Sequence, residues 1–161
     1  MKYELIGEPN EYGLRQIRYL KDLPGINAGE LGGWLESEKN LSQEGNAWVS
    51  GNARVFGNAR VSGNAHVSGD ARVSGKAQVG NARVYGDAWV FSNADWLVVS
   101  PIGSRDGSTT ITKGKKGDIV NCGCFTGSIE VFLEQVTKTH GDNNHARAYR
   151  AMIDMWNAKK G

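Results

Sequence analysis

The sequence predicts a mainly β protein, in which a parallel β-helix of six-residue repeats is followed by a small α+β module. Two regularities lead to this fold class. Alanine recurs at 47, 53, 59, 65, 71 and 77 and, after one shortened repeat, at 82, 88 and 94. Valine stands two places after these alanines from Val49 to Val90, until Trp96 takes the last slot. The period ends after Trp96, so a different kind of module is expected there.

Each repeat corresponds to one short strand and one turn. In the pattern Ala, variable residue, Val, the alanine and valine point to one side of a strand and the residue between them points to the other. Glycine with asparagine or aspartate then forms the corner, because these residues adopt positive φ at low steric cost. One repeat cannot bury its own apolar face, so successive coils must stack around a continuous core.

We predict the β-helix over residues 26–97, preceded by an N-terminal cap over residues 1–25. Leu35 and Leu41 keep the six-residue interval upstream of the clear repeats, which indicates an irregular first coil. A solenoid needs a cap at its open end. The candidate cap carries three apolar residues among charged ones: Leu14, Ile17 and Leu20.

Residues 98–161 are predicted to form a ββαα module. The two strands are expected over 108–112 and 118–125, joined by the lysine-rich turn 113–117. A first helix is expected to begin after Ser128 as N-cap and to end at Gly141. A second helix is expected from about residue 143 to Lys160, where cations suit the helix dipole.

Three repeats per coil assign the outward residues of the β-helix to three faces. Two of the faces carry aromatic side chains, Trp48 and Tyr85 on one and Phe56, Trp89 and Phe91 on the other. Exposed aromatic residues on a rigid surface are typical of a contact site. We therefore predict self-association through these five residues. The alternative is that the C-terminal segment folds back over them within one chain.

Composition and charge exclude several classes of protein. The net charge of +2 is too small to indicate a nucleic-acid-binding protein. The first residues lack the pattern of an export signal, and no run reaches the ~20 apolar residues of a membrane span. A cytoplasmic protein without membrane contact is expected. Cys122 and Cys124 are separated by one glycine, a poor spacing for a mutual disulfide, so reduced thiols are expected.

The repeats resemble the hexapeptide-repeat family, in which an aliphatic residue is followed four places later by a small one. Val49 and Ala53 have this spacing, as do Val55 and Ala59. The resemblance implies a left-handed triangular β-helix and a homotrimer. Many members of the family transfer acyl groups with a histidine base, and His66 is the only histidine of these repeats. A lone imidazole in a repetitive slot is more often a surface substitution, and the zinc site of related carbonic anhydrases needs three histidines.

The module after the repeats carries the candidate ligand-binding residues. Gly103-Ser104-Arg105 combines turn amides, a hydroxyl and a guanidinium, which suits a phosphate or carboxylate group. The same segment is also an ordinary surface turn. The complete candidate set is Ser104, Arg105, Thr109, Thr110, Cys122, Cys124 and His140.

Thiol chemistry is a second hypothesis for this module. If Cys122 and Cys124 lie on one face of a strand, His140 and His145 complete a candidate zinc site, although zinc sites favour longer spacing between cysteines. Cys124 with His140 is the candidate catalytic pair. The alternative for both cysteines is a small buried residue at a close helix contact. No cofactor is expected.

The GGW segment, the Asn-Ala-x-Val repeats, the GSR turn, the CGCF strand and the THG helix end together resemble small proteins of phages and prophages. This resemblance favours a non-catalytic oligomer that binds a small anionic ligand, such as a nucleotide, or a host protein, and so counters a host defence. One alternative is an enzyme, either an acyltransferase or a thiol- or metal-dependent activity. Another is a structural or assembly scaffold.

Overall fold

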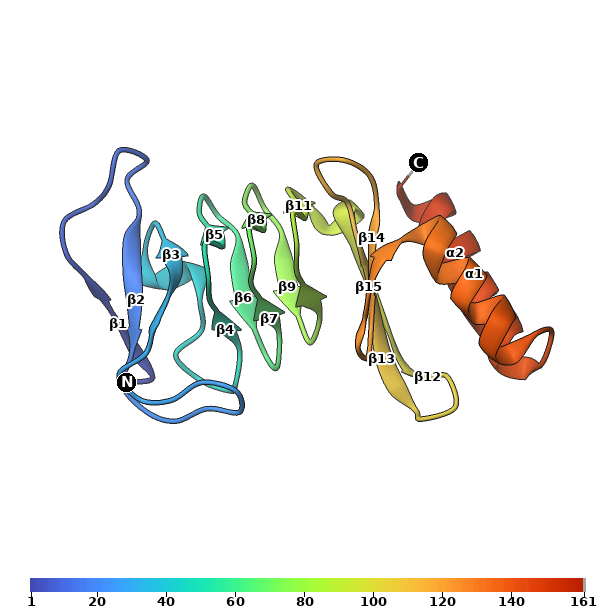
Figure 1. Ribbon diagram of the computed structural model, residues 1–161. Coiled ribbons are helices and arrows are strands. Elements are labelled where there is room, and N and C mark those ends of the chain that lie inside the picture. Colours follow the sequence, from blue (N-terminus) through green and yellow to red (C-terminus); the bar gives the residue numbers. More distant parts are fainter. Residues whose placement is uncertain (161) are drawn as a thin grey trace.

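A ladder of short parallel strands occupies the middle of the computed structural model, which describes residues 1–160 (Figure 1). Every third strand pairs, which gives the faces β4–β7–β10, β5–β8–β11 and β6–β9. The chain is therefore a β-solenoid of about three turns, as predicted. The strands are β4 Trp48–Val49, β5 Arg54–Val55, β6 Arg60–Ser62, β7 His66–Val67, β8 Arg72–Val73, β9 Gln78–Gly80, β10 Arg83–Val84 and β11 Trp89–Val90.

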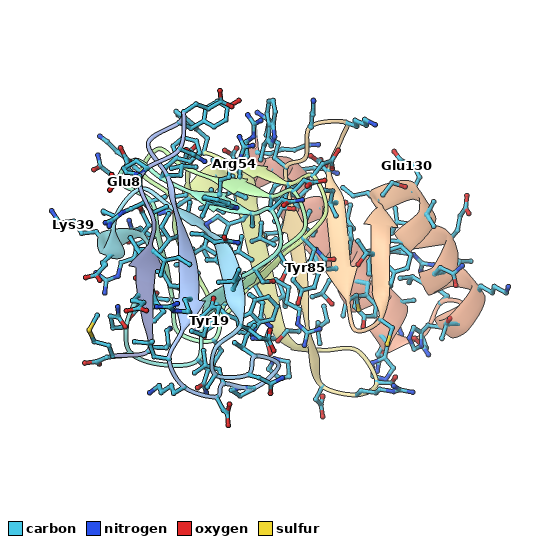
Figure 2. The ribbon with its side chains drawn as sticks, turned by 60° about the vertical axis from the view of Figure 1, so that its left-hand side comes forward. Glu8, Tyr19, Lys39, Arg54, Tyr85 and Glu130 are labelled. Carbon is cyan, nitrogen blue, oxygen red and sulfur yellow. The ribbon has the colours of Figure 1, made fainter. Side chains whose placement is uncertain are left out.

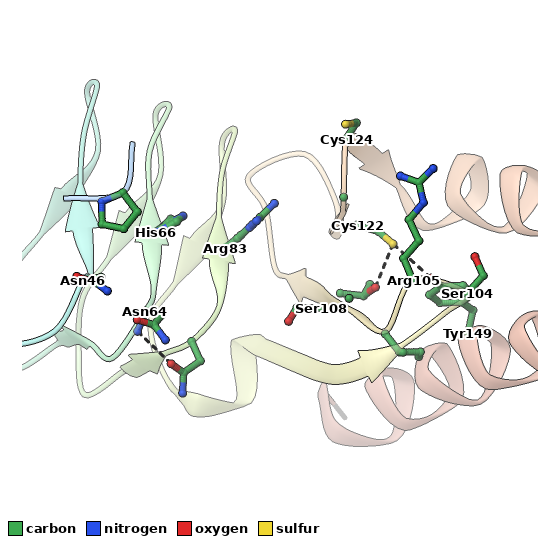
Figure 3. Close-up of a pocket in the computed structure, with 16 residues that line it drawn as sticks. Asn46, Asn64, His66, Arg83, Ser104, Arg105, Ser108, Cys122, Cys124 and Tyr149 are labelled. Atoms are coloured by element: carbon green, nitrogen blue, oxygen red, sulfur yellow. Dashed lines mark hydrogen bonds between the residues drawn. The ribbon is translucent and has the colours of Figure 1, made fainter. Parts of the chain in front are cut away.

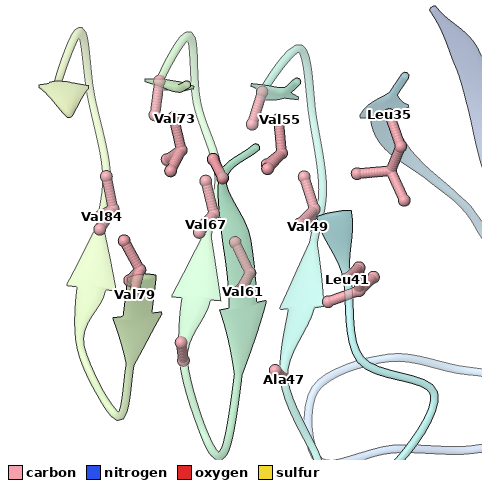
Figure 4. Close-up of a cluster of buried hydrophobic side chains, with 14 of the residues drawn as sticks. Leu35, Leu41, Ala47, Val49, Val55, Val61, Val67, Val73, Val79 and Val84 are labelled. Carbon is pink, nitrogen blue, oxygen red and sulfur yellow. The ribbon is translucent and has the colours of Figure 1, made fainter. Parts of the chain in front are cut away.

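The predicted alanine and valine core fills the interior of the solenoid (Figure 4). From Ala47 to Val90 these residues are at most 1% exposed. Burial of this apolar surface is the main stabilising contribution, because each coil covers the open end of the one before it. Ala94 departs from the pattern, since it is exposed and lies in the 3₁₀ helix η2 Asn93–Asp95. Ser92 accepts a hydrogen bond from the backbone N–H of Ala94, which supports this turn in place of another strand.

The N-terminal segment extends one face of the solenoid into a wider sheet. Strands β1 Tyr3–Ile6, β2 Arg15–Tyr19 and β3 Leu31–Leu35 pair antiparallel, and β3 then pairs parallel with β5. The 3₁₀ helix η1 Glu38–Asn40 follows. Leu14 and Ile17 are buried, whereas Leu20 is 43% exposed and does not belong to the core.

Side chains bind the backbone groups of the first coil that have no preceding coil to pair with. The hydroxyl of Tyr19, at the N-terminal end of the coils (Figure 2), donates to the carbonyl of Val49 (2.8 Å) and accepts from the Val49 N–H (2.9 Å). The ammonium group of Lys2 donates to the carbonyl of Ala47 (2.7 Å). Asn40 donates to the carbonyl of Ala59 (2.8 Å) on another face. These contacts close an edge that would otherwise pair with other chains.

The burial of Lys2 makes stability depend on pH. Lys2 is fully buried, and this desolvation, with a smaller effect of Lys21, lowers its pKa from 10.5 to about 8. Between these two values the unfolded chain binds a proton that the folded chain lacks, so stability rises with pH. From pH 7 to pH 9.5 we expect this group to raise the free energy of unfolding by about 2 kcal/mol.

Urea denaturation at both pH values measures this rise, with Lys2→Met as the comparison. The variant removes the titrating group and should show a rise smaller by that amount. The range stops at pH 9.5 because burial raises the pKa of Tyr3 and Tyr19, whose ionisation in the unfolded chain opposes the effect at higher pH. Equal pH dependence in the two proteins would show that Lys2 is not buried as an amine.

The C-terminal region contains a four-stranded antiparallel sheet with two helices on one face, so the predicted ββαα order is wrong by two strands. Trp96–Ile102 forms a full strand that the prediction omitted. The expected strand 118–125 is two strands, because Gly123 adopts a positive φ of 58° and reverses the chain. The elements are β12 Trp96–Ile102, β13 Gly107–Thr112, β14 Ile119–Cys122, β15 Phe125–Ser128, α1 Ile129–His140 and α2 Asn144–Lys160. Gly161, the last residue of the predicted module, lies outside the described residues.

The four-stranded sheet stands between the last coil and the helices (Figure 1). One face packs on the solenoid core through Trp96, Val98 and Ile119. The other face packs under the helices, where Trp156 is fully buried. Neither α1 nor α2, the helices of residues 1–160, is long and apolar enough to span a membrane.

The sheet also binds the exposed backbone edge of the last coil. The N–H of Arg83 donates to the Thr110 hydroxyl (3.0 Å), and the Asn121 amide donates to the Arg83 carbonyl (3.3 Å). On the next face, the N–H of Trp89 donates to the carbonyl of Lys113 (2.7 Å). Both ends of the solenoid are therefore covered by other parts of the same chain.

Candidate functional site

A cleft of about 700 Å³ is lined by residues of the β4–β7–β10 face and by residues of the C-terminal sheet (Figure 3). Its size is typical of sites for small organic ligands. The solenoid wall contains Asn46, Asn64, His66, Asn81 and Arg83. The opposite wall contains Ser104, Arg105, Ser108, Thr109, Cys122 and Cys124.

Two residues of the solenoid wall, His66 and Arg83, belong to a column of planar side chains from three successive coils. Parallel register places Trp48, His66 and Arg83 at equivalent positions. The Trp48 and His66 rings stack with centroids 4.2 Å apart and 16° between their planes. The Trp48 Nε1–H donates to the carbonyl of Pro24 (3.2 Å), which fixes the base of the column. Burial and the neighbouring Arg83 both lower the pKa of His66, which favours the neutral imidazole.

The shortened repeat places Asn81 at this wall. Other turns of the solenoid use a glycine with positive φ, whereas here Asn81 adopts a φ of 57°. Its side-chain oxygen accepts from the backbone N–H of Asn64 (3.0 Å). Asparagine tolerates this conformation better than most residues. Because the repeat is one residue shorter, a polar side chain, that of Asn81, lies at this corner of the cleft.

The opposite wall begins at the turn between β12 and β13. Gly103 has a φ of 82°, and a Cβ there would lie 2.0 Å from the Tyr149 hydroxyl, so only glycine fits. This close approach seats the turn on α2. Ser104 and Arg105 at the tip of the turn are exposed and line the cleft.

Below this turn the wall contains a small hydrogen-bonded cluster. The Thr109 hydroxyl donates to Cys122 Sγ (3.1 Å), and the Tyr149 oxygen lies 3.6 Å from the same sulfur. Burial raises the pKa of Tyr149 to about 12, with Cys122 adding to the effect. The phenol therefore stays protonated and keeps a hydrogen to donate.

The structure brings most of the predicted ligand-binding residues to one cleft. Two lie elsewhere. Thr110 points toward the solenoid and accepts the N–H of Arg83, so it supports the cleft from behind. His140 ends α1, where its ring lies 5.3 Å from that of His145 and 6.1 Å from that of Tyr149, and it does not line the cleft.

The candidate zinc site and the candidate Cys–His pair are not assembled. The two cysteines do not share a strand face, because β14 ends at Cys122 and Cys124 is exposed in the following turn. Among residues 1–160 no group of three or more histidine, cysteine and carboxylate side chains is close enough to hold a metal ion. Cys124 lines the cleft whereas His140 does not, so the predicted pair does not meet in this cleft.

Sequence reasoning did not identify the contribution of the solenoid to this cleft. In the sequence His66 is a candidate catalytic base, and Arg83 is one of several arginines at the outward position of the repeats. His66 and Arg83 line the cleft because the sheet packs on the last coil. No local sequence pattern predicts this packing. The available signal is the shortened repeat at residues 75–79, which is followed by Gly80 and Asn81.

The five aromatic residues of the predicted interface differ in exposure. Trp48 is partly buried and stacks on His66, and Tyr85 and Phe56 are half-buried. Trp89 and Phe91 are 39% and 67% exposed on the β5–β8–β11 face. Arg72 lies over the Trp89 ring, 5.2 Å from its centroid. The exposed aromatic surface is thus concentrated on the face away from the cleft.

Comparison with known proteins supports the repeat region. Residues 47–63, 53–69 and 65–81 match the family model described as the YdcK beta solenoid repeat. These overlapping matches fall on strands β4 to β9. No curated protein sequence matches the chain at a significant level. The similarity to this family model therefore concerns the coils.

Proposed function

We propose that this chain is a non-catalytic binding protein that holds a small anionic ligand in the cleft between the solenoid and the C-terminal sheet. The observation that carries the proposal is the charge of the lining. Arg83 and Arg105 stand on opposite walls, with His66 next to Arg83, and none of the described lining residues is a carboxylate. Unneutralised guanidinium groups in a concave site attract and orient anions.

The neutral polar groups support the same conclusion. Asn64 and Asn81 on one wall and Ser104 and Ser108 on the other provide amide and hydroxyl donors to a ligand. An anion bound among such donors is held by hydrogen bonds to charged and neutral groups together, which fixes its orientation.

Equilibrium binding of inorganic phosphate, nucleotides and carboxylates, followed by thermal stabilisation, tests the proposal. Removing a charged donor from a bound anion costs about 1.5–3 kcal/mol, so Arg105→Ala should weaken binding about tenfold or more. Arg147→Ala is the matched control, because Arg147 is exposed on α2 and bonds only to Asn144 among the described side chains. Absence of stabilisation by every anion would refute the proposal.

Self-association forms part of the same proposal. Trp89 and Phe91, with Phe56 beside them, offer an apolar patch that a second copy would bury. The resemblance to hexapeptide-repeat proteins favours a left-handed coil and a trimer. Sedimentation velocity tests this: the double change Trp89→Ser with Phe91→Ser should yield monomers, whereas a wild-type chain that is already monomeric contradicts it.

The resemblance to phage and prophage proteins suggests a biological role for such an oligomer. A protein that holds an anionic host molecule in several copies of one cleft lowers its free concentration. We propose sequestration of a host signal, or capture of a host defence protein, as that role.

A further inference from the structure

We propose that the ligand of the cleft is a nucleotide-sized organic phosphate whose phosphate group lies between Arg83 and Arg105, with His66 taking up a proton as it binds. This inference rests on the proposed function and specifies the ligand class. Three observations support it: the fixed position of Arg83, the seating of the Arg105 turn, and the stacked setting of His66.

Arg83 is held in place before any ligand arrives. Its backbone N–H and carbonyl bind Thr110 (3.0 Å) and Asn121 (3.3 Å), and Asn121 in turn accepts from the Thr126 hydroxyl (2.7 Å). The last coil and the sheet are joined at this residue, so its side chain extends from a fixed part of the backbone. A fixed backbone limits the positions that the guanidinium can take, which lowers the entropy lost when an anion binds.

Arg105 approaches from the other side of the cleft. Its turn is seated on α2 by the close fit of Gly103 against Tyr149, while the side chain itself is exposed. Two guanidinium groups and an imidazole give donors from several directions, which suits the three terminal oxygens of a phosphate ester better than a planar carboxylate. A cleft of about 700 Å³ is far larger than one phosphate, so the rest of the ligand lies along Ile102 and the asparagines.

The surroundings of His66 link the binding of the ligand to protonation of the imidazole. Arg83 is its neighbour on the next coil, Trp48 stacks on it from the previous coil, and Arg105, Cys122, Cys124 and Tyr149 are the titratable or charged groups of the facing wall. Burial, and after it the charge of Arg83, disfavours the imidazolium. A phosphate dianion beside Arg83 neutralises the effect of that guanidinium and attracts the proton.

Titration calorimetry with AMP, adenosine and citrate tests the inference. We expect AMP to bind at least tenfold more tightly than adenosine and citrate. In two buffers with different protonation enthalpies, AMP binding near neutral pH should be accompanied by proton uptake, which His66→Gln abolishes. Arg83→Gln and Arg105→Gln should each lower AMP affinity about tenfold or more. Arg60→Gln, on the β6–β9 face outside the cleft, should leave AMP affinity unchanged.

A second measurement keeps the test independent of how the variants fold. The imidazole NMR signals of His66 in the wild-type chain, titrated with and without AMP, should show a higher pKa in the complex. Tight binding of citrate with no binding of AMP would overturn the inference and leave the proposed anion site standing. AMP binding without proton uptake would overturn the role of His66. Binding of no anion at all would refute the proposed function itself.

Discussion

Replacing Tyr19 with phenylalanine is expected to lower the free energy of unfolding by about 2–4 kcal/mol. The Tyr19 hydroxyl binds both the N–H and the carbonyl of Val49, at the point where the first coil has no preceding coil. Tyr19 and Val49 are both fully buried, so water does not replace the lost partner easily. Each buried backbone group left without a partner costs about 1–3 kcal/mol. Such a loss is a large part of the stability of an ordinary domain.

Urea denaturation followed by circular dichroism measures the effect of Tyr19→Phe. Tyr85→Phe is the control, because Tyr85 is a half-buried tyrosine on the outside of the solenoid with no hydrogen bond to its hydroxyl among residues 1–160. We expect a change of less than about 0.5 kcal/mol in the control. Similar stabilities for the two variants would mean that the first coil is not closed by Tyr19.

Replacing Trp156 with alanine is expected to cost about 3–5 kcal/mol, the usual range for removing a buried tryptophan. Trp156 is fully buried between α2 and the sheet, and its Nε1–H donates to Asp118 (2.9 Å). The substitution leaves a cavity and removes one partner of that carboxylate, which Lys160 also binds (2.7 Å). The sheet wall of the cleft rests on the same helix, so ligand binding should weaken as well.

Chemical denaturation of Trp156→Ala and Trp89→Ala separates a buried from an exposed tryptophan. Trp89 is 39% exposed on the solenoid, so its removal should change stability by less than about 1 kcal/mol in the dissociated chain. Because both variants lose one indole, circular dichroism is a better probe than fluorescence. A mild effect of Trp156→Ala would show that the helices do not pack on the sheet in this way.

The coils could be predicted from the sequence because the relevant information is local and repeated. The spacing of Val49 and Ala53, which the later repeats keep, indicates which residues face inward. The coils must stack because these residues have to be buried. The ends of the solenoid could not be predicted in the same way. Tyr19 and Lys2 act on backbone atoms of Val49 and Ala47, more than twenty-five residues away. Nothing in the neighbourhood of either side chain identifies those partners.

The C-terminal module was predicted only in part for a related reason. The helices follow from apolar spacing and from Ser128, whose hydroxyl accepts the N–H of Val131 (3.2 Å) as an N-cap does. Strand β12 has no clear alternation of apolar and polar residues, because it packs on the solenoid on one side and on the helices on the other. Because both faces of this sheet are covered, apolar residues point to both sides of the strand, and the two-residue alternation that usually identifies a strand is absent.

The candidate site shows the same limit. Chemistry within the Gly103-Ser104-Arg105 segment could be inferred from residue types, and the turn does line the cleft. Arg83 could not be selected from its repeat, because arginine occupies the same slot in several coils and only the last coil meets the sheet. A site formed where two parts of a chain dock depends on tertiary contacts that neither part encodes alone.

Native mass spectrometry tests the central claim, that the cleft binds an anion, most directly. The wild-type chain would be measured alone and with inorganic phosphate, AMP and citrate in turn, beside the double variant Arg83→Ala with Arg105→Ala. We predict a bound anion on each copy of the wild-type chain and none on the variant at the same ligand concentration. Equal occupancy in both proteins, or the bare polypeptide mass in every sample, would contradict the account.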